Sequence, residues 1–166
     1  MQARTSMFPF AILFALALGA TCASAGLSIE RNISITDDAG GTLVMLSVGS
    51  RHDLGGESTT TARFTDFQAA SDRRRINGEV NRERVSTAEQ VETTYNGVLE
   101  IFTPSADDAG GRMNTLAFEN LSILREGEGP ELSGQVIFNG EIRDAADLPR
   151  PALRSLARAL RFFHFA

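Results

Sequence analysis

The chain has 166 residues, a formal net charge of −5 at neutral pH and a single cysteine. A chain of this length can form one domain with its own hydrophobic core. Without a second cysteine it cannot form an intramolecular disulfide, and cysteine-based metal sites are excluded as well. All of its basic residues are arginines, and the acidic balance makes nucleic acid a poor partner.

Residues 1–25 have the features of a secretory signal peptide. An apolar run at 7–20 is followed by the small residues "ASA", which end at Ala25 and suit signal peptidase. The sequence therefore predicts cleavage at about Ala25/Gly26 and export to the periplasm or the extracellular space of a bacterium. The apolar run is shorter than the ~20 residues that span a bilayer, which disfavours an uncleaved anchor. A lipoprotein acylated at Cys22 is a weaker alternative.

Several segments alternate apolar and polar residues with the period of two that half-buried strands show. The first, 27–35, places leucine and isoleucine on one face, and 43–46 is apolar on both faces, as in a central strand. Residues 61–67 give a mixed pattern, and the alternation within 76–85 is lost towards its end. The polar segment "RHDLGGESTT" at 51–60 predicts a long mobile loop.

The sequence "DDAGG" occurs at 37–41 and again at 107–111, each time between strand-like segments. Glycine supplies the positive φ that tight turns need, so both copies predict hairpin loops. Calcium binding is the alternative, but calcium loops usually place their oxygen ligands at alternate positions. Further along, the apolar pattern shifts phase at Glu119-Asn120, which predicts a β-bulge.

Asn-Gly, a strong hairpin-turn signal, occurs at 77–78, 96–97 and 139–140. Apolar and polar residues nevertheless separate more cleanly between two faces if 91–102 and 132–143 are each one continuous strand. The sequence therefore favours strands that pass through these glycines, with the Asn-Gly turn as the alternative.

In this arrangement the strand glycines lie on the apolar face, next to large apolar side chains. The residues concerned are Gly97, Gly134, Gly140, Tyr95 and Phe138. Glycine on a strand leaves a notch in the surface, which a neighbouring backbone, the protein's own helix or a bound ligand can enter. These five residues are the predicted ligand-binding set, and simple packing is the alternative.

Residues 150–163 predict an amphipathic helix, with Pro151 suited to its first turn. The apolar positions at helical spacing are Leu153, Leu156, Ala157, Leu160 and Phe163. Arg154, Arg158 and Arg161 fall on another face, where they could contact an anionic membrane surface. Alternatively, the leucines pack on the sheet and the arginines are solvated.

A second group of arginines lies within the chain. Arg73, Arg74 and Arg75 form a basic triplet in the connection that precedes the strand at 76. Together with Arg82 and Arg84 they could form one anion-binding edge. Solvated charges that pair with nearby glutamates are the alternative.

Candidate catalytic groups are few. Only His52 and His164 could act as bases near neutral pH, and His52 lies in a polar segment with Asp53 and Ser58. No nucleophile elbow, phosphate-binding loop, dinucleotide fingerprint or zinc spacing is present. The sequence therefore favours a protein that is not an enzyme and predicts no catalytic residue, cofactor or metal. Catalysis by a pair of carboxylates is the alternative, because the chain has 21 acidic residues, but no motif singles out a pair.

The expected fold is mainly β: an antiparallel sheet, sandwich or open barrel of about six to eight strands, with a C-terminal amphipathic helix packed on it. We expect a signal peptide at 1–25, a β domain at 26–148 and the helix of the same domain at 149–166. An outer-membrane barrel is disfavoured because the chain has no tryptophan and only one tyrosine for interfacial girdles.

The predicted function is that of an exported, non-enzymatic binding or envelope-structural module whose ligand the sequence does not identify. The alternative is peripheral binding to anionic lipid through the arginine-rich helix. Possible partners are an envelope protein or an anionic membrane surface.

Overall fold

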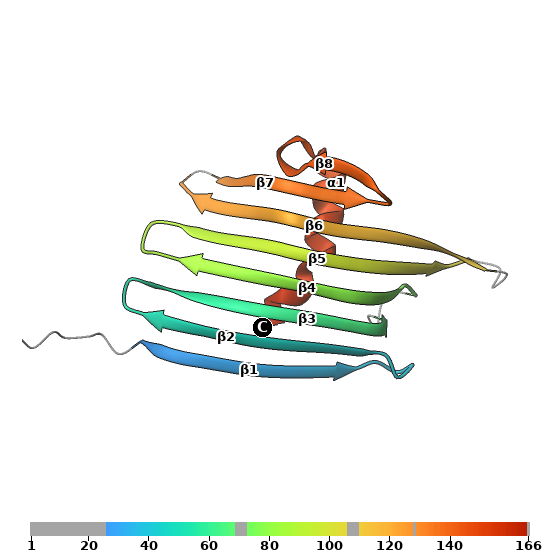
Figure 1. Ribbon diagram of the computed structural model, residues 1–166, viewed down its shortest axis with the longest axis horizontal. Helices are drawn as coiled ribbons and strands as arrows, with labels where there is room; N and C mark the ends of the chain where they lie inside the picture. Colours follow the sequence, from blue (N-terminus) through green and yellow to red (C-terminus); the bar gives the residue numbers. More distant parts are fainter. Residues whose placement is uncertain (1–25, 69–72, 106–109, 128, 166) are drawn as a thin grey trace, which may run out of the picture.

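The computed structural model describes residues 26–68, 73–105, 110–127 and 129–165. They form one eight-stranded antiparallel sheet, in which every strand pairs with its neighbours in the chain, and a helix that crosses one face of the sheet (Figure 1). The predicted mainly β fold with a packed C-terminal helix is confirmed, and the sheet is open. The predicted signal peptide lies outside the described residues.

The strands run in the order of the sequence. Their bounds are β1 Leu27–Thr36, β2 Thr42–His52, β3 Gly55–Gln68, β4 Arg75–Ser86, β5 Val91–Pro104, β6 Gly111–Glu126, β7 Gly129–Phe138 and β8 Glu141–Asp144. A short 3₁₀ turn, η1 (Ala145–Asp147), leads to the helix α1 (Arg150–Ala159) and a second 3₁₀ segment, η2 (Arg161–Phe165).

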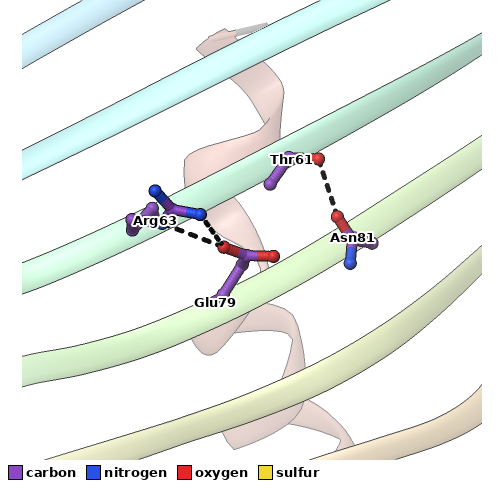
Figure 2. Close-up of polar contacts among 4 residues, drawn as sticks. All are labelled: Thr61, Arg63, Glu79 and Asn81. Atoms are coloured by element: carbon purple, nitrogen blue, oxygen red, sulfur yellow. Dashed lines mark hydrogen bonds and ion pairs between the residues drawn. The ribbon is translucent and has the colours of Figure 1, made fainter.

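The sheet has two distinct faces. The face that α1 and η2 cover, here called the helix face, carries the buried core side chains of successive strands, which include Leu43, Ala62, Val80, Leu99, Phe118 and Val136. On the other face, here called the open face, Arg63 donates to Glu79 at 2.7 and 2.9 Å, and Thr61 donates to Asn81 at 2.7 Å (Figure 2). Alternation along each strand separates the two sets.

Helix α1 begins as the sequence predicts, with Pro151 in its first turn. Its regular part ends at Ala159, and the tighter η2 segment follows. The change of helical period rotates the following side chains, so Phe162 and Phe163 are both buried. Ala157, one of the apolar positions at helical spacing, has an exposed side chain.

Aromatic contacts hold η2 on the sheet. The ring of Phe162 lies 5.3 Å from that of Phe64 and 5.8 Å from that of Phe67, both on β3, with edge-to-face geometry. The ring of Phe163 lies 5.5 Å from that of Tyr95 on β5. Edge-to-face aromatic pairs add to the stability gained from burial alone. These contacts fix the position of the helix on the sheet.

The three Asn-Gly dipeptides adopt two different structures. Gly78 and Gly97 lie inside β4 and β5, as predicted. The prediction of a strand through Asn139-Gly140 is wrong: these two residues have φ of 50° and 84° and form a two-residue hairpin turn between β7 and β8. The Asn139 side chain also accepts a hydrogen bond from the Thr115 backbone N–H at 2.8 Å, which holds the turn against β6.

The predicted loop at 51–60 is also wrong. Strand β2 continues to His52, which pairs with Gly55 across a two-residue turn, and β3 begins at once. Polar residues can occupy these strands because this end of the antiparallel sheet is open to solvent. Likewise β4 remains a strand to Ser86.

The first "DDAGG" copy forms the predicted β1–β2 hairpin loop. The Asp37 carboxylate accepts hydrogen bonds from the backbone N–H groups of Ala39 and Gly41, each at 2.8 Å. It also accepts one from the Gln68 backbone N–H, which ties the loop to β3. Residues 107–109 of the second copy lie outside the described residues.

The predicted β-bulge at Glu119-Asn120 is confirmed. The pairing of β6 with β7 shifts between Glu119 and Ser122, and Asn120 has a φ of 49°. The bulge restores Leu121 to the helix face, where it is fully buried. Among the described residues, no helix is long and apolar enough to span a membrane.

Candidate functional site

A groove of about 690 Å³ runs between α1 and the sheet. Its floor is formed by side chains of β4 to β7, among which are Ile76, Leu99, Ile101, Leu116 and Val136. Leu156 and Phe162 border it on the helical side. The volume lies within the range of ligand pockets, and an apolar lining with a few polar groups is their usual composition.

Small residues on α1 leave room for this groove. Ala152, Ser155 and Ala159 all line it, and their spacing of three and four residues places them on one stripe of the helix. Leu156 and Leu160 are buried against the sheet beside that stripe. The helix therefore contacts the sheet through its large residues, and the groove lies between the stripe of small residues and the sheet.

Charged residues surround the groove. Arg74, Arg158 and Arg161 line it, and so do Glu141 and Arg143, which form an ion pair of 2.7 Å. Because that pair neutralises itself, Arg158 and Arg161 on the helical side give the rim a positive charge.

The turn at Asn139-Gly140 determines the polar end of the groove. Because the turn has two residues, Glu141 pairs with Phe138 and Arg143 pairs with Val136 across the hairpin. Directly opposed residues share a face of the sheet, so both charged side chains point to the helix face and line the groove. A continuous strand would have placed Ile142 there instead.

Of the five residues predicted to form a ligand-binding notch, only Phe138 lines the groove. Tyr95 is buried under Phe163, and Gly140 lies in the turn. A Cβ on Gly97 would collide with the backbone of β4, and one on Gly134 with the backbone of Asn120 in the β6 bulge. At Gly97 and Gly134, glycine therefore lets neighbouring strands approach closely.

Of the six arginines predicted to bind a membrane or an anion, some line the groove and others do not. Arg158, Arg161 and Arg74 line the groove, whereas Arg154, Arg73 and Arg75 do not. The single edge formed by the triplet with Arg82 and Arg84 is not present. Arg75 and Arg84 lie towards opposite ends of β4, nine residues and roughly 30 Å apart.

Most of the groove-lining residues were not among the predicted site residues. Ile76, Ile101 and Leu116 were recognisable as apolar strand positions, but the sequence does not show which of them the helix leaves uncovered. The stripe of Ala152, Ser155 and Ala159 was a detectable signal for a gap. His52 lies exposed at the β2–β3 turn, and the His164 side chain is outside the described part.

The chain matches no protein-family model, no curated protein and no solved structure. Within the described ranges, no three histidine, cysteine or carboxylate side chains are grouped so that they could hold a metal ion. The apolar groove and its positive rim are therefore the features from which function is inferred.

Proposed function

We propose that this protein is an exported, non-enzymatic binding module that holds an amphipathic ligand in the groove between α1 and the sheet. The apolar part of the ligand lies on the floor formed by β4 to β7, and its anionic head group lies at the arginine rim. The observation that carries the proposal is the apolar groove of about 690 Å³ with Arg158 and Arg161 at its edge.

Both parts of such a ligand gain from this site. Transfer of a methylene group from water to an apolar surface contributes about 0.8 kcal/mol, so a chain of ten methylenes contributes roughly 8 kcal/mol before the costs of association. Arg158 and Arg161 are exposed on the helical side, where an anionic head group can remain partly hydrated. The positively charged rim then favours ligands whose head group is negatively charged.

The proposal is tested by filling the groove. Displacement of a fluorescent fatty acid should report binding to the wild-type protein, and Ile101→Trp should weaken it about tenfold or more because the larger ring occupies the floor. Val98→Trp is the matched control, since Val98 lies three residues away on the same strand and points to the open face. Equal binding by both variants would exclude the groove.

The rim is tested on the helix. Arg158 lines the groove and Arg154, one turn earlier, does not, yet both are exposed arginines of α1. Arg158→Gln should weaken binding of a fatty acid severalfold and leave a fatty alcohol of equal length unaffected, whereas Arg154→Gln should change neither. Thermal melts of both variants establish that the fold is retained.

Peripheral membrane binding predicts a different set of results. If the helix binds an anionic surface through its arginines, Arg154→Gln and Arg158→Gln should reduce co-sedimentation with phosphatidylglycerol vesicles to a similar extent. Ile101→Trp should then have no effect, because the floor of the groove is not involved. That combination would overturn the groove proposal in favour of the membrane.

A further inference from the structure

A second depression lies on the helix face at the other end of the sheet, beyond η2. It has a volume of about 750 Å³ and lies among β1 to β4 near the β2–β3 and β4–β5 turns. Arg31, Arg51, Arg82 and Arg84 all line it, and we call it the basic basin. None of its lining residues belongs to the groove beside α1.

Strand register explains why the arginines gather there. Arg82 is opposite the buried Thr60, and two residues further along β4 Arg84 is opposite Ser58, so both arginines point to the helix face. Arg51 lies on the same face of β2, because it is an even number of residues from the buried Met45.

Acidic residues near the basin belong to the other face or to a turn. Glu30 and Glu57 border the depression, but strand alternation directs their side chains to the open face. Asp53 lies in the β2–β3 turn and is exposed. The strands around the basin thus direct arginines to the helix face and carboxylates away from it.

Arg82 is the buried part of the basin, with only 9% of its surface exposed. One terminal nitrogen donates to the backbone carbonyl of Phe163 at 2.7 Å, and the other donates to the Thr60 hydroxyl at 3.0 Å. The guanidinium also lies over the Phe163 ring, 5.3 Å from its centre. Its Nε has no hydrogen-bond partner in the described part of the chain.

Among the described residues, no carboxylate pairs with this buried cation. Burial lowers the pKa of Arg82; Tyr95 acts in the opposite direction, and the nearby charge of Arg84 lowers the pKa as well. Burying an unpaired charge, or leaving a buried donor unpaired, costs free energy that a hydrogen-bonded anion offsets. The Ser47 hydroxyl, 2.9 Å from that of Thr60, adds a further group that can donate to such an anion.

We propose that the basic basin binds a tetrahedral oxyanion of the phosphate or sulfate class, with Arg82 as the buried donor and Arg84 and Arg51 at the mouth. Phosphate oxygens suit this set because guanidinium groups bind them through paired N–H donors. The anion is either a free ion or the charged group of a larger molecule, and the two sources share this chemistry.

The experiment is a titration of the purified protein with inorganic phosphate or sulfate at constant ionic strength, followed by NMR shifts and by the melting temperature. We expect saturable binding that chloride does not reproduce, and a loss of affinity of about tenfold in Arg84→Gln. Arg84 is exposed, so its substitution should leave the fold intact.

Arg63→Gln on the open face is the matched control and should retain affinity within about twofold. Equal affinity loss in both variants, or a response that chloride reproduces, would overturn the proposal.

Two further measurements identify the source of the anion and distinguish binding in the basin from binding in the groove. If glycerol phosphate or phosphatidylglycerol vesicles compete with inorganic phosphate and bind more tightly, the anion belongs to a larger molecule. Tighter binding of inorganic phosphate indicates the free ion, and both results support the basin. Ile101→Trp should leave phosphate binding unchanged, so the basin and the groove can fail independently.

Discussion

The helix face and the open face are built from the same eight strands but are stabilised by different interactions. Among the described residues, eleven apolar strand residues of the helix face are less than a tenth exposed, from Leu43 and Met45 on β2 to Val136 on β7. On the open face, Leu46 and Val48 are half exposed, and polar side chains such as Arg63 and Glu79 pair across strands in contact with water.

This difference indicates where the free energy of folding arises. Burial of aromatic and aliphatic side chains contributes kilocalories per residue, whereas an exposed ion pair contributes about 0–1 kcal/mol. A single sheet with one covered face therefore depends on the layer formed by α1 and η2. Substitutions on the two faces measure this dependence directly.

The largest effect is expected on the helix face, at η2. Phe162→Ala removes the ring that packs on Phe64 and Phe67, and should lower the free energy of unfolding by about 3–5 kcal/mol. Urea denaturation measures the change. Val98→Ala on the open face is the control and should cost less than about 1 kcal/mol, because its side chain is half exposed. Equal costs would mean that the helix layer does not dominate stability.

A smaller loss is expected where glycine allows two strands to approach. Gly97 has a φ of 144°, and an added Cβ would collide with the backbone of Glu79 and Val80. Gly97→Ala should therefore destabilise the protein by about 1–3 kcal/mol. Gly129→Ala is the control, since a Cβ there meets no atom of the described residues within 4 Å apart from its chain neighbours, and it should change stability by less than about 0.5 kcal/mol. A neutral Gly97→Ala would contradict the close approach of β4 and β5.

The β1–β2 loop should show a pH-dependent effect. Hydrogen bonds from the backbone, that of Gln68 foremost, hold the pKa of Asp37 below its ordinary value. A carboxyl whose pKa is lowered by folding stabilises the protein above its unfolded pKa and loses that contribution as the pH falls through the folded pKa. Asp37→Asn should thus lower the melting temperature at pH 7 by a few degrees, with a difference from wild type that narrows in acid.

Asp38 provides the control for this loop, because it is adjacent and exposed. Asp38→Asn should leave the melting temperature and its pH dependence close to those of wild type. The same acid response in both variants would show that the total charge of the loop, and not the Asp37 hydrogen bonds, is responsible.

The smallest effect is expected on the open face. A double-mutant cycle on Arg63 and Glu79 should give a coupling energy of about 0.2–1 kcal/mol that falls with added salt, because the side chains are 70% and 39% exposed. A coupling comparable with the cost of Phe162→Ala would remove the contrast between the faces.

Much of this architecture is visible in the sequence because alternation along a strand depends only on local geometry. The β-bulge at Glu119-Asn120 and the helix after Pro149 follow from such local patterns. The extent of the helix does not, because the change to 3₁₀ geometry at η2 depends on how Phe162 and Phe163 pack against distant strands.

The Asn-Gly dipeptides show where local patterns fail. A continuous strand through 132–143 and a hairpin turn at Asn139-Gly140 both preserve the alternation of apolar and polar residues. The two arrangements place Ile142 on opposite faces of the sheet. The pattern favours burial of this isoleucine, yet β8 is a four-residue edge strand in which Ile142 is 61% exposed. The groove was unpredictable for a related reason: it depends on which part of α1 lies over which strand, and a single sequence does not specify that pairing.

The order of the elements along the chain also has a consequence for folding. Each strand pairs with its neighbour across a short connection, so the sheet can form by local steps. Its cover depends on distant contacts, such as that between Arg82 and Phe163, which are 81 residues apart. Such contacts form late because they close long loops. A chain with the sheet formed and α1 not docked would present the apolar helix face to solvent, and exposed apolar surface of this kind promotes aggregation.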